Sequence, residues 1–190
     1  MGLAVGVFGG AFDPPHVGHV ELARRGVEHF ALDRLLVRVI EDPGHKEVGT
    51  APAARLHLAE LAFAPLEAAE VGLDPFARTI DSLEALRLDD PVLLVGADEF
   101  AAYLEWKDPE RVLELARLGV ATRPGVERGR LEAARMALER PERVSYFEIE
   151  PLPVSSSEIR ARAAAGEPID GLVPAAVAAE IARLALYRGR

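Results

Sequence analysis

The chain has 190 residues, 49% of them hydrophobic and 28% charged, with a formal net charge of −9 at pH 7. This is the composition of an ordinary globular protein, and no stretch reaches the roughly 18 uninterrupted apolar residues of a membrane span. The absence of cysteine excludes disulfides, thiol nucleophiles and iron–sulfur clusters, and the acidic charge argues against a broad nucleic-acid-binding surface.

The length predicts one domain over residues 1–190, with a C-terminal helical part from about residue 155 to 190. The first residues have the pattern of a strand without a basic lead, so we expect no signal or transit peptide and a cytoplasmic protein. The chain has neither asparagine nor glutamine, 14 prolines, and twenty arginines against two lysines. These features favour a thermophilic source, although a GC-rich genome would produce the arginine bias alone.

The first expected element is a buried strand over residues 3–8, followed by Gly9, Gly10 and a helix that begins near His16. Glycines let the backbone turn tightly and approach a ligand closely, and a helix N-terminus offers free N–H groups to an anion. His16 and His19 are three residues apart and therefore lie on one face of the first turn. This pattern predicts a phosphate site.

A metal site is the alternative interpretation of the two histidines. No glutamate lies between them, and no cysteine exists to complete a zinc site. We therefore expect phosphate chemistry and no metal ligands from the protein.

Strand and helix patterns alternate along the rest of the chain, which implies parallel crossovers and a doubly wound, mainly parallel α/β sheet. Ligands of such sheets bind beyond the carboxyl ends of the strands, where residues 9–10, 96–98 and 122–125 would meet. The further expected strands are 35–40, 91–95, 120–122 and 143–149, and the expected helices are 53–65, 79–87, 109–117, 130–139, one from Ser155 and one after Pro174.

A second anion site is predicted at the helix that starts at Ser155. Ser155 and Glu158 have the spacing of a capping box, so a well-started helix is the simpler explanation. Three hydroxyls, of Ser155, Ser156 and Ser157, with Arg160 about one turn further on, would also suit a polyphosphate.

Asp98 and Trp106 each allow a structural and a functional interpretation. Asp98 follows Gly96 after a strand, where it is either a helix N-cap or an acceptor for ribose hydroxyls. Trp106 is the sole tryptophan, and such residues are most often packed in a core. Its charged neighbours favour instead a partly open face, on which a flat heteroaromatic ring would stack.

The segment GGAFDPPHVGH at residues 9–19 resembles the GG-x-F-D-P-x-H-x-G-H signature of the nucleotidyltransferase superfamily, whose members transfer AMP or CMP to phosphate-bearing acceptors. The resemblance implies that His16 and His19 contact the nucleotide phosphates and stabilise the transition state. It places Gly9, Gly10 and Phe12 beside the nucleotide.

Two further segments carry the same resemblance. Residues 154–160 are similar to the late I-S-S-T-x-I-R motif, which implies that Ser155, Ser156, Ser157 and Arg160 hold the β- and γ-phosphates of ATP. Residues 43–46, Pro-Gly-His-Lys, resemble the P-P-H-K element, which implies that Lys46 reaches the reacting phosphates. Upstream, residues 38–42 depart from the proline and small polar residues usual in relatives.

The nicotinate-nucleotide adenylyltransferase branch is indicated by Gly-Ala-Asp at 96–98, Trp106-Lys107, Arg-Pro-Gly at 123–125 and residues 79–86. The resemblance implies transfer of AMP from ATP to nicotinic acid mononucleotide, with Mg²⁺ on the triphosphate. It assigns Gly96 and Asp98 to ATP, and Lys46, Thr79, Trp106 and Arg123 to the acceptor.

Other functions remain open at this point. One is an adenylyltransferase for nicotinamide mononucleotide, phosphopantetheine or flavin mononucleotide. Residues 77–78, Ala-Arg, replace the Ser-Tyr common before the threonine, so the acceptor pocket differs there. Another is a regulatory module that binds ATP without turnover. In each case the expected partners are small molecules, with neither nucleic acid nor a membrane among them.

Overall fold

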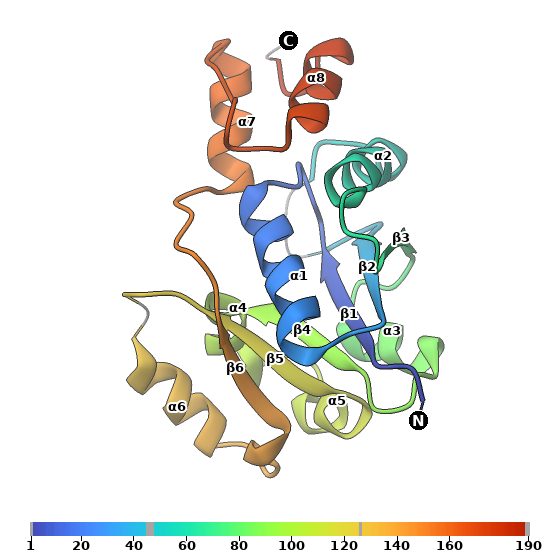
Figure 1. The fold of residues 1–190 in the computed structure, drawn as a ribbon, viewed down its shortest axis with the longest axis vertical. Coiled ribbons are helices and arrows are strands. Elements are labelled where there is room, and N and C mark those ends of the chain that lie inside the picture. Colours follow the sequence, from blue (N-terminus) through green and yellow to red (C-terminus); the bar gives the residue numbers. More distant parts are fainter. Residues whose placement is uncertain (1, 45–47, 126, 189–190) are drawn as a thin grey trace.

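Parallel strands form one sheet in the order β3-β2-β1-β4-β5-β6 in the computed structural model, which describes residues 2–44, 48–125 and 127–188 (Figure 1). This order reverses between β1 and β4, the place where doubly wound sheets open a crevice for nucleotides. The predicted parallel α/β fold is confirmed. The strands are β1 (Val5–Gly10), β2 (Arg34–Ile40), β3 (Ala69–Asp74), β4 (Val92–Gly96), β5 (Arg117–Thr122) and β6 (Val144–Glu148).

Helices cover both faces of the sheet because successive strand residues point to opposite sides. Phe8 of β1 packs in a buried cluster with Leu58 and Phe63, whereas its neighbour Val7 joins a second cluster with Leu113. The first cluster includes residues of α1 (Val17–Phe30), α2 (Pro52–Phe63), α7 (Ser156–Ala165) and α8 (Ala175–Arg183). The second includes residues of α3 (Thr79–Leu86), α4 (Ala97–Ala101), α5 (Pro109–Leu115) and α6 (Arg128–Met136).

The last two helices lie together at one end of the molecule, beside α2 and beyond the start of α1 (Figure 1). Ile159 of α7 and Val177 of α8 are fully buried in the cluster that also contains Leu58. The C-terminal part therefore shares a core with the sheet. Among the helices of the described residues, none has the length and apolar character needed to cross a membrane.

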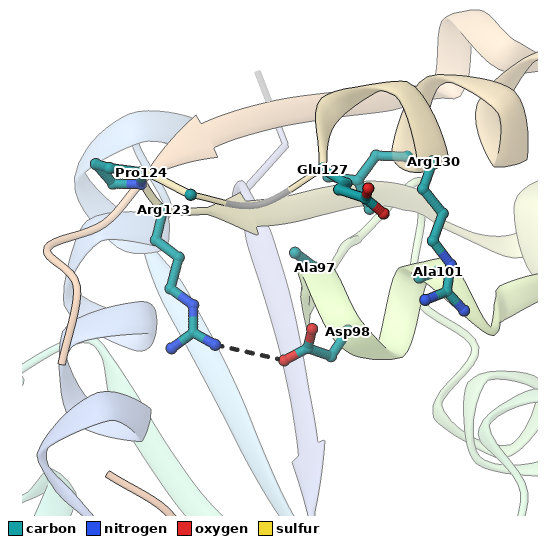
Figure 2. A pocket seen from close by; sticks show the side chains of 9 residues that line it. Ala97, Asp98, Ala101, Arg123, Pro124, Glu127 and Arg130 are labelled. Carbon is teal, nitrogen blue, oxygen red and sulfur yellow. Dashed lines mark ion pairs between the residues drawn. The ribbon is translucent and has the colours of Figure 1, made fainter. Parts of the chain in front are cut away.

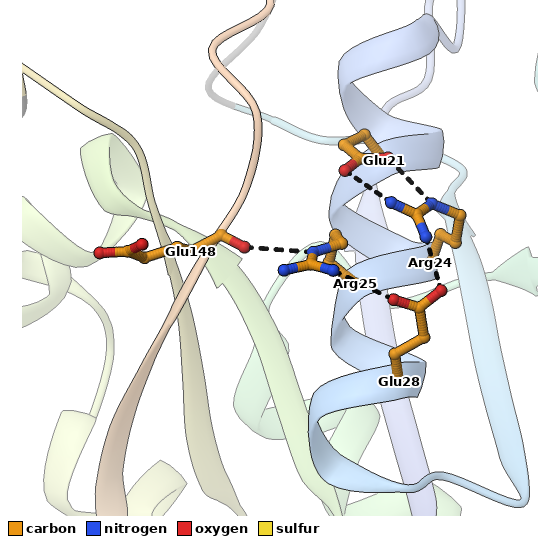
Figure 3. Close-up of polar contacts among 5 residues, drawn as sticks. All are labelled: Glu21, Arg24, Arg25, Glu28 and Glu148. Atoms are coloured by element: carbon orange, nitrogen blue, oxygen red, sulfur yellow. Dashed lines mark hydrogen bonds and ion pairs between the residues drawn. The ribbon is translucent and has the colours of Figure 1, made fainter.

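Charged side chains on the outer face of α1 link this helix to the end of β6 (Figure 3). Arg24 pairs with Glu21 at 2.9 Å and with Glu28 at 2.5 Å. Arg25 pairs with Glu28 at 3.3 Å and donates to the main-chain oxygen of Glu148 at 3.4 Å. Each exposed pair contributes only about 0.3–0.5 kcal/mol, so the buried clusters provide most of the stability of this packing.

One strand and one cap differ from the expectation. β3 has the sequence AEVGLD and lies at the edge of the sheet, where only Asp74 is buried, so it lacks the apolar run that marks an inner strand. The interpretation of Asp98 as an N-cap is wrong, because α4 begins one residue earlier and is preceded by Gly96 as its N-cap. Two 3-10 turns, η1 (Tyr103–Glu105) and η2 (Pro141–Arg143), complete the described elements.

Candidate active site

The two histidines cap the start of α1 reciprocally. The Nδ1 atom of His16 accepts a hydrogen bond from the main-chain N–H of His19 at 3.3 Å, and Nδ1 of His19 accepts one from the N–H of His16 at 3.2 Å. The rings stack with centroids 3.6 Å apart and 22° between their planes. An Nδ1 atom that accepts carries no proton, so each neutral ring has its proton on Nε2. The first turn thus fixes two imidazole N–H donors.

Burial decides the charge of His16. Its pKa is lowered from 6.5 to about 4, because the folded protein removes the ring from water. At neutral pH His16 is therefore an uncharged hydrogen-bond donor. A neutral donor of this kind suits a site for phosphates, because it donates a hydrogen bond without first taking up a proton and stays in one tautomer.

Phe12 supports the histidines from the core. Its ring is 2% exposed, and it meets the ring of His19 edge to face with centroids 5.1 Å apart. Its φ angle is 49°, a left-handed conformation rare outside glycine. A Cβ atom on Gly10 would lie 3.0 Å from the Phe12 ring, so Gly10 gives this ring its space, whereas Gly9 lies in the more open part of β1.

The N-terminus of α7 docks onto the residues that precede His16. Ser156 Oγ donates to the main-chain oxygen of Pro14 at 2.9 Å, and Arg160 Nη1 donates to that of Asp13 at 2.7 Å. Arg160 Nη2 also donates to Ser157 Oγ at 3.2 Å. Ser155 is the N-cap, and its Oγ accepts from the main-chain N–H of Glu158, as its spacing predicted. The structure thus brings two helix N-termini, two imidazoles and a guanidinium together.

Close packing at Gly18 makes this docking possible. A Cβ atom there would lie 3.1 Å from Nδ1 of His16 and 3.3 Å from Cγ1 of Val154, the residue before the N-cap of α7. Both distances are shorter than ordinary contacts, so a side chain at position 18 would push the two helix starts apart.

A separate open cavity of about 420 Å³ lies beyond the ends of β4 and β5 (Figure 2), and neither the two histidines nor Arg160 line it. Asp98 of α4 and Arg123, which follows β5, face each other across it with Oδ2 and Nη2 3.6 Å apart. Arg130 of α6 lines its far side. The Asp98 side chain is 91% exposed, so this ion pair is weakly held and can open for a ligand. Gly96 ends β4 just before this cavity.

The remaining acceptor residues lie on other elements. Trp106 follows η1, is half-buried, and packs against Tyr103 with ring centroids 5.0 Å apart, so one part of the indole is in the core and another is open. Thr79 is the first residue of α3, half-buried at the helix start. Lys46 lies outside the described residues.

Arg55 is a site residue that the sequence interpretation missed. Its side chain is 1% exposed, although it stands in the apolar helix α2. It donates to four main-chain oxygens at 2.7 to 3.0 Å, those of Ala11, Ile40, Glu41 and Thr50. This one guanidinium ties the loop after β1 to both ends of the segment that contains Lys46. An arginine on the buried face of an apolar helix is unusual, and this position was the sequence signal that could have identified Arg55.

Asp13 and Tyr187 form a second contact that was not expected. Asp13 is 3% exposed, and its Oδ1 accepts a hydrogen bond from the Tyr187 hydroxyl at 2.7 Å. Among the described residues, no group of three or more histidine, aspartate or glutamate side chains is arranged to hold a metal ion.

Comparisons with known proteins show the family of the chain. Residues 7–162 match the model of a family described as cytidylyltransferase-like. The chain is 36% identical to a probable nicotinate-nucleotide adenylyltransferase of Chromobacterium violaceum, over 99% of this chain and 100% of that protein. It is 35% identical to a protein of the same description from Bordetella avium, over 97% and 98%.

A solved structure shows the same fold. The nicotinic acid mononucleotide adenylyltransferase of Plasmodium falciparum, complexed with NaAD, superposes with a TM-score of 0.74 at 16% identity, over 98% of each chain.

Proposed function

The chain belongs to the nicotinate-nucleotide adenylyltransferases, within the cytidylyltransferase-like family, and from this we propose that it transfers AMP from ATP to nicotinic acid mononucleotide. The products are nicotinic acid adenine dinucleotide and pyrophosphate, in a step of NAD biosynthesis. The observation that carries the proposal is the docking of α7 on the segment before His16, through Ser156 and Arg160. That contact joins the two motifs that a triphosphate would need.

The chemistry requires little from a general base. The phosphate monoester of the acceptor has a second pKa of about 6 and is mostly a dianion at neutral pH. One of its oxygens forms a bond to the α-phosphorus of ATP, and the bond from that phosphorus to the bridging oxygen breaks, which releases pyrophosphate. The obstacle is the repulsion between two anions, so catalysis consists of positioning and charge stabilisation.

His16 and His19 would supply the central stabilisation. Their Nε2–H groups are fixed by the reciprocal caps, so no rearrangement is needed as charge develops on the α-phosphate oxygens. The positive end of the α1 helix dipole would add to the same potential. Because His16 is neutral, its contribution is a directed hydrogen bond and not a net charge.

Arg160 and the serines would hold the leaving group. The two observed hydrogen bonds of Arg160 leave further N–H donors on its guanidinium for phosphate oxygens. Ser155, Ser156 and Ser157 present the start of α7 to the same β- and γ-phosphates. Pyrophosphate would therefore depart against a positive surface.

The acceptor and the adenosine would occupy the neighbouring parts of the rim. We place the pyridine ring on the open part of Trp106, near Thr79, with Lys46 and Arg123 toward its phosphate. Asp98 would exchange Arg123 for ribose hydroxyls when ATP binds, which their exposed ion pair permits. Gly9, Gly10 and Gly96 lie at the strand ends, where they would be beneath these ligands, and the buried Phe12 would act through His19.

A divalent cation accompanies ATP in such transfers, and we propose that it is Mg²⁺, bound to the triphosphate and water. The enzyme would act where ATP is supplied, so a cytoplasmic location stays our prediction.

Pyrophosphate release tests the proposal. The purified protein is assayed with ATP, Mg²⁺ and four acceptors in parallel: nicotinic acid mononucleotide, nicotinamide mononucleotide, phosphopantetheine and flavin mononucleotide. We expect the highest kcat/KM with nicotinic acid mononucleotide. A higher value with another acceptor would change the substrate, and ATP binding without release from any acceptor would indicate a regulatory module.

A further inference from the structure

Residues 13–17, which lead into α1, are held at four points by the C-terminal part of the chain. Two of these contacts come from α7, through Ser156 and Arg160, and belong to the phosphate site already described. A third joins the main-chain N–H of Val17 to the oxygen of Leu172 at 3.0 Å. The fourth is the hydrogen bond from the Tyr187 hydroxyl to Asp13 Oδ1, at 2.7 Å.

The Tyr187 contact spans 174 residues of sequence and has no part in the function proposed above. Tyr187 lies after α8, outside the segments to which the proposed function assigns a substrate contact. It is half-buried, and burial raises the pKa of its hydroxyl above the ordinary value, so the group stays protonated and donates at neutral pH.

Within the part of the chain that the structure describes, the Tyr187 hydroxyl is the one donor to the Asp13 carboxylate. The carboxylate is almost fully buried, and its other oxygen, Oδ2, has no hydrogen-bond partner among the described residues. Burial lowers the pKa of the Arg55 guanidinium, and the negative charge of the nearby Asp13 partly counteracts this lowering. Removing the Tyr187 hydroxyl would therefore leave a buried carboxylate without a hydrogen bond, which favours movement of Asp13 toward water.

Movement of Asp13 would reach the histidines through a short stretch of backbone. Its main-chain oxygen accepts from Arg160, and three residues later His16 forms the cap whose partner is His19. We propose that Tyr187 is a positioning residue for the transfer reaction: its hydroxyl holds Asp13 and thereby fixes the backbone that presents His16, His19 and Arg160 to the phosphates. This inference rests on the proposed function, because it needs a reaction that these three side chains promote.

The test compares Tyr187→Phe with Tyr146→Phe. Both variants keep the ring and lose one hydroxyl that donates a hydrogen bond, and Tyr146 donates to Leu131 in another part of the fold. For Tyr187→Phe we expect kcat to fall about tenfold, less than for loss of a direct donor. Tyr146→Phe should keep kcat within about twofold of the wild type.

Hydrogen exchange gives a readout that does not depend on turnover. The main-chain amides of residues 11–19 should exchange at least about fivefold faster in Tyr187→Phe than in either reference protein, because this segment has lost one of its anchors. Unchanged exchange there, or a kcat equal to that of Tyr146→Phe, overturns the proposal. A Tyr187→Phe protein that does not fold by circular dichroism assigns Tyr187 a purely structural role and overturns it as well.

The two hypotheses can fail separately. A wild-type protein that releases no pyrophosphate with any acceptor refutes the proposed function, and with it the transfer that Tyr187 would serve. Normal wild-type turnover with an unaffected Tyr187→Phe variant refutes the positioning role alone.

Discussion

Replacing His16 with asparagine separates the two tasks that we assign to this side chain. His16 is the N-cap of α1 through Nδ1, and its Nε2 atom is the proposed phosphate donor. Asparagine is among the most favoured N-cap residues, and its side-chain oxygen occupies a place similar to that of Nδ1. Its amide group is too short to reach the position of Nε2. His16→Asn should therefore keep the cap and lose the donor, whereas His16→Ala loses both.

The expected magnitudes follow from the contacts. Loss of one well-aimed donor to the transition state lowers kcat by about 10²–10³-fold, so both variants should show this loss. Both also lose the stacking of two rings whose centroids are 3.6 Å apart, worth about 0.5–1.5 kcal/mol. Only His16→Ala loses the cap as well, which costs about 1 kcal/mol more. The variants should thus match in kcat and differ by about 1 kcal/mol in free energy of unfolding.

Two measurements check this prediction. Pyrophosphate release at saturating ATP and acceptor gives kcat, and urea unfolding followed by circular dichroism gives the free energy of unfolding. If His16→Asn keeps more than a third of the wild-type kcat, the Nε2 atom is not a transition-state donor. If the two variants unfold at the same urea concentration, Nδ1 contributes nothing as a cap.

Three further predictions concern pH, Arg160 and Arg55. The pKa of His16 falls from 6.5 to about 4 on folding, so the unfolded chain takes up the proton first as the pH is lowered. The free energy of unfolding of the wild type should therefore fall by on the order of 3 kcal/mol between pH 6.5 and 4, a loss that His16→Asn does not show. A constant difference between the free energies of unfolding of the two proteins across this pH range would contradict the prediction. Arg160→Ala should weaken binding of a non-hydrolysable ATP analogue about 10–100-fold, since bonds to charged groups contribute about 1.5–3 kcal/mol, and unchanged affinity by calorimetry would rule out its contact with the triphosphate. Arg55→Lys should lower the free energy of unfolding by about 2–4 kcal/mol, because an ammonium lacks the planar fork that satisfies four carbonyls; a loss below about 1 kcal/mol in urea unfolding would show that those carbonyls find other partners.

Local patterns predicted the part of the fold that local forces determine. The sequence predicted the strand before Gly9 and the helix N-caps at His16 and Ser155. Turns, caps and hydrophobic periodicity depend on residues close together in the sequence, so they can be recognised there. β3 was missed because an edge strand buries too little to need an apolar run. The cap expected at Asp98 was displaced by two residues, to Gly96, within the usual uncertainty of helix ends.

Contacts between distant segments were beyond the reach of such patterns. Arg55 becomes interpretable only when the carbonyls of three separate segments are seen around it. The partnership of Asp13 with Tyr187 likewise has no local signal, since the two residues are 174 positions apart. Phe12 was expected beside the nucleotide as part of its motif, and the structure turns its ring into the core, against His19.

The joining of residues 13–14 to residues 156–187 also has a consequence for the making of the protein. The contacts at Ser156, Arg160 and Tyr187 span 142, 147 and 174 positions. Residues 13–19 therefore leave the ribosome long before the residues that contact them have been synthesised. A growing chain can form β1 and α1 early, yet it cannot assemble the proposed reaction centre until its last helices have emerged. Activity thus requires residues 156–187 to have been synthesised, and a chain that lacks them is left without a competent catalyst.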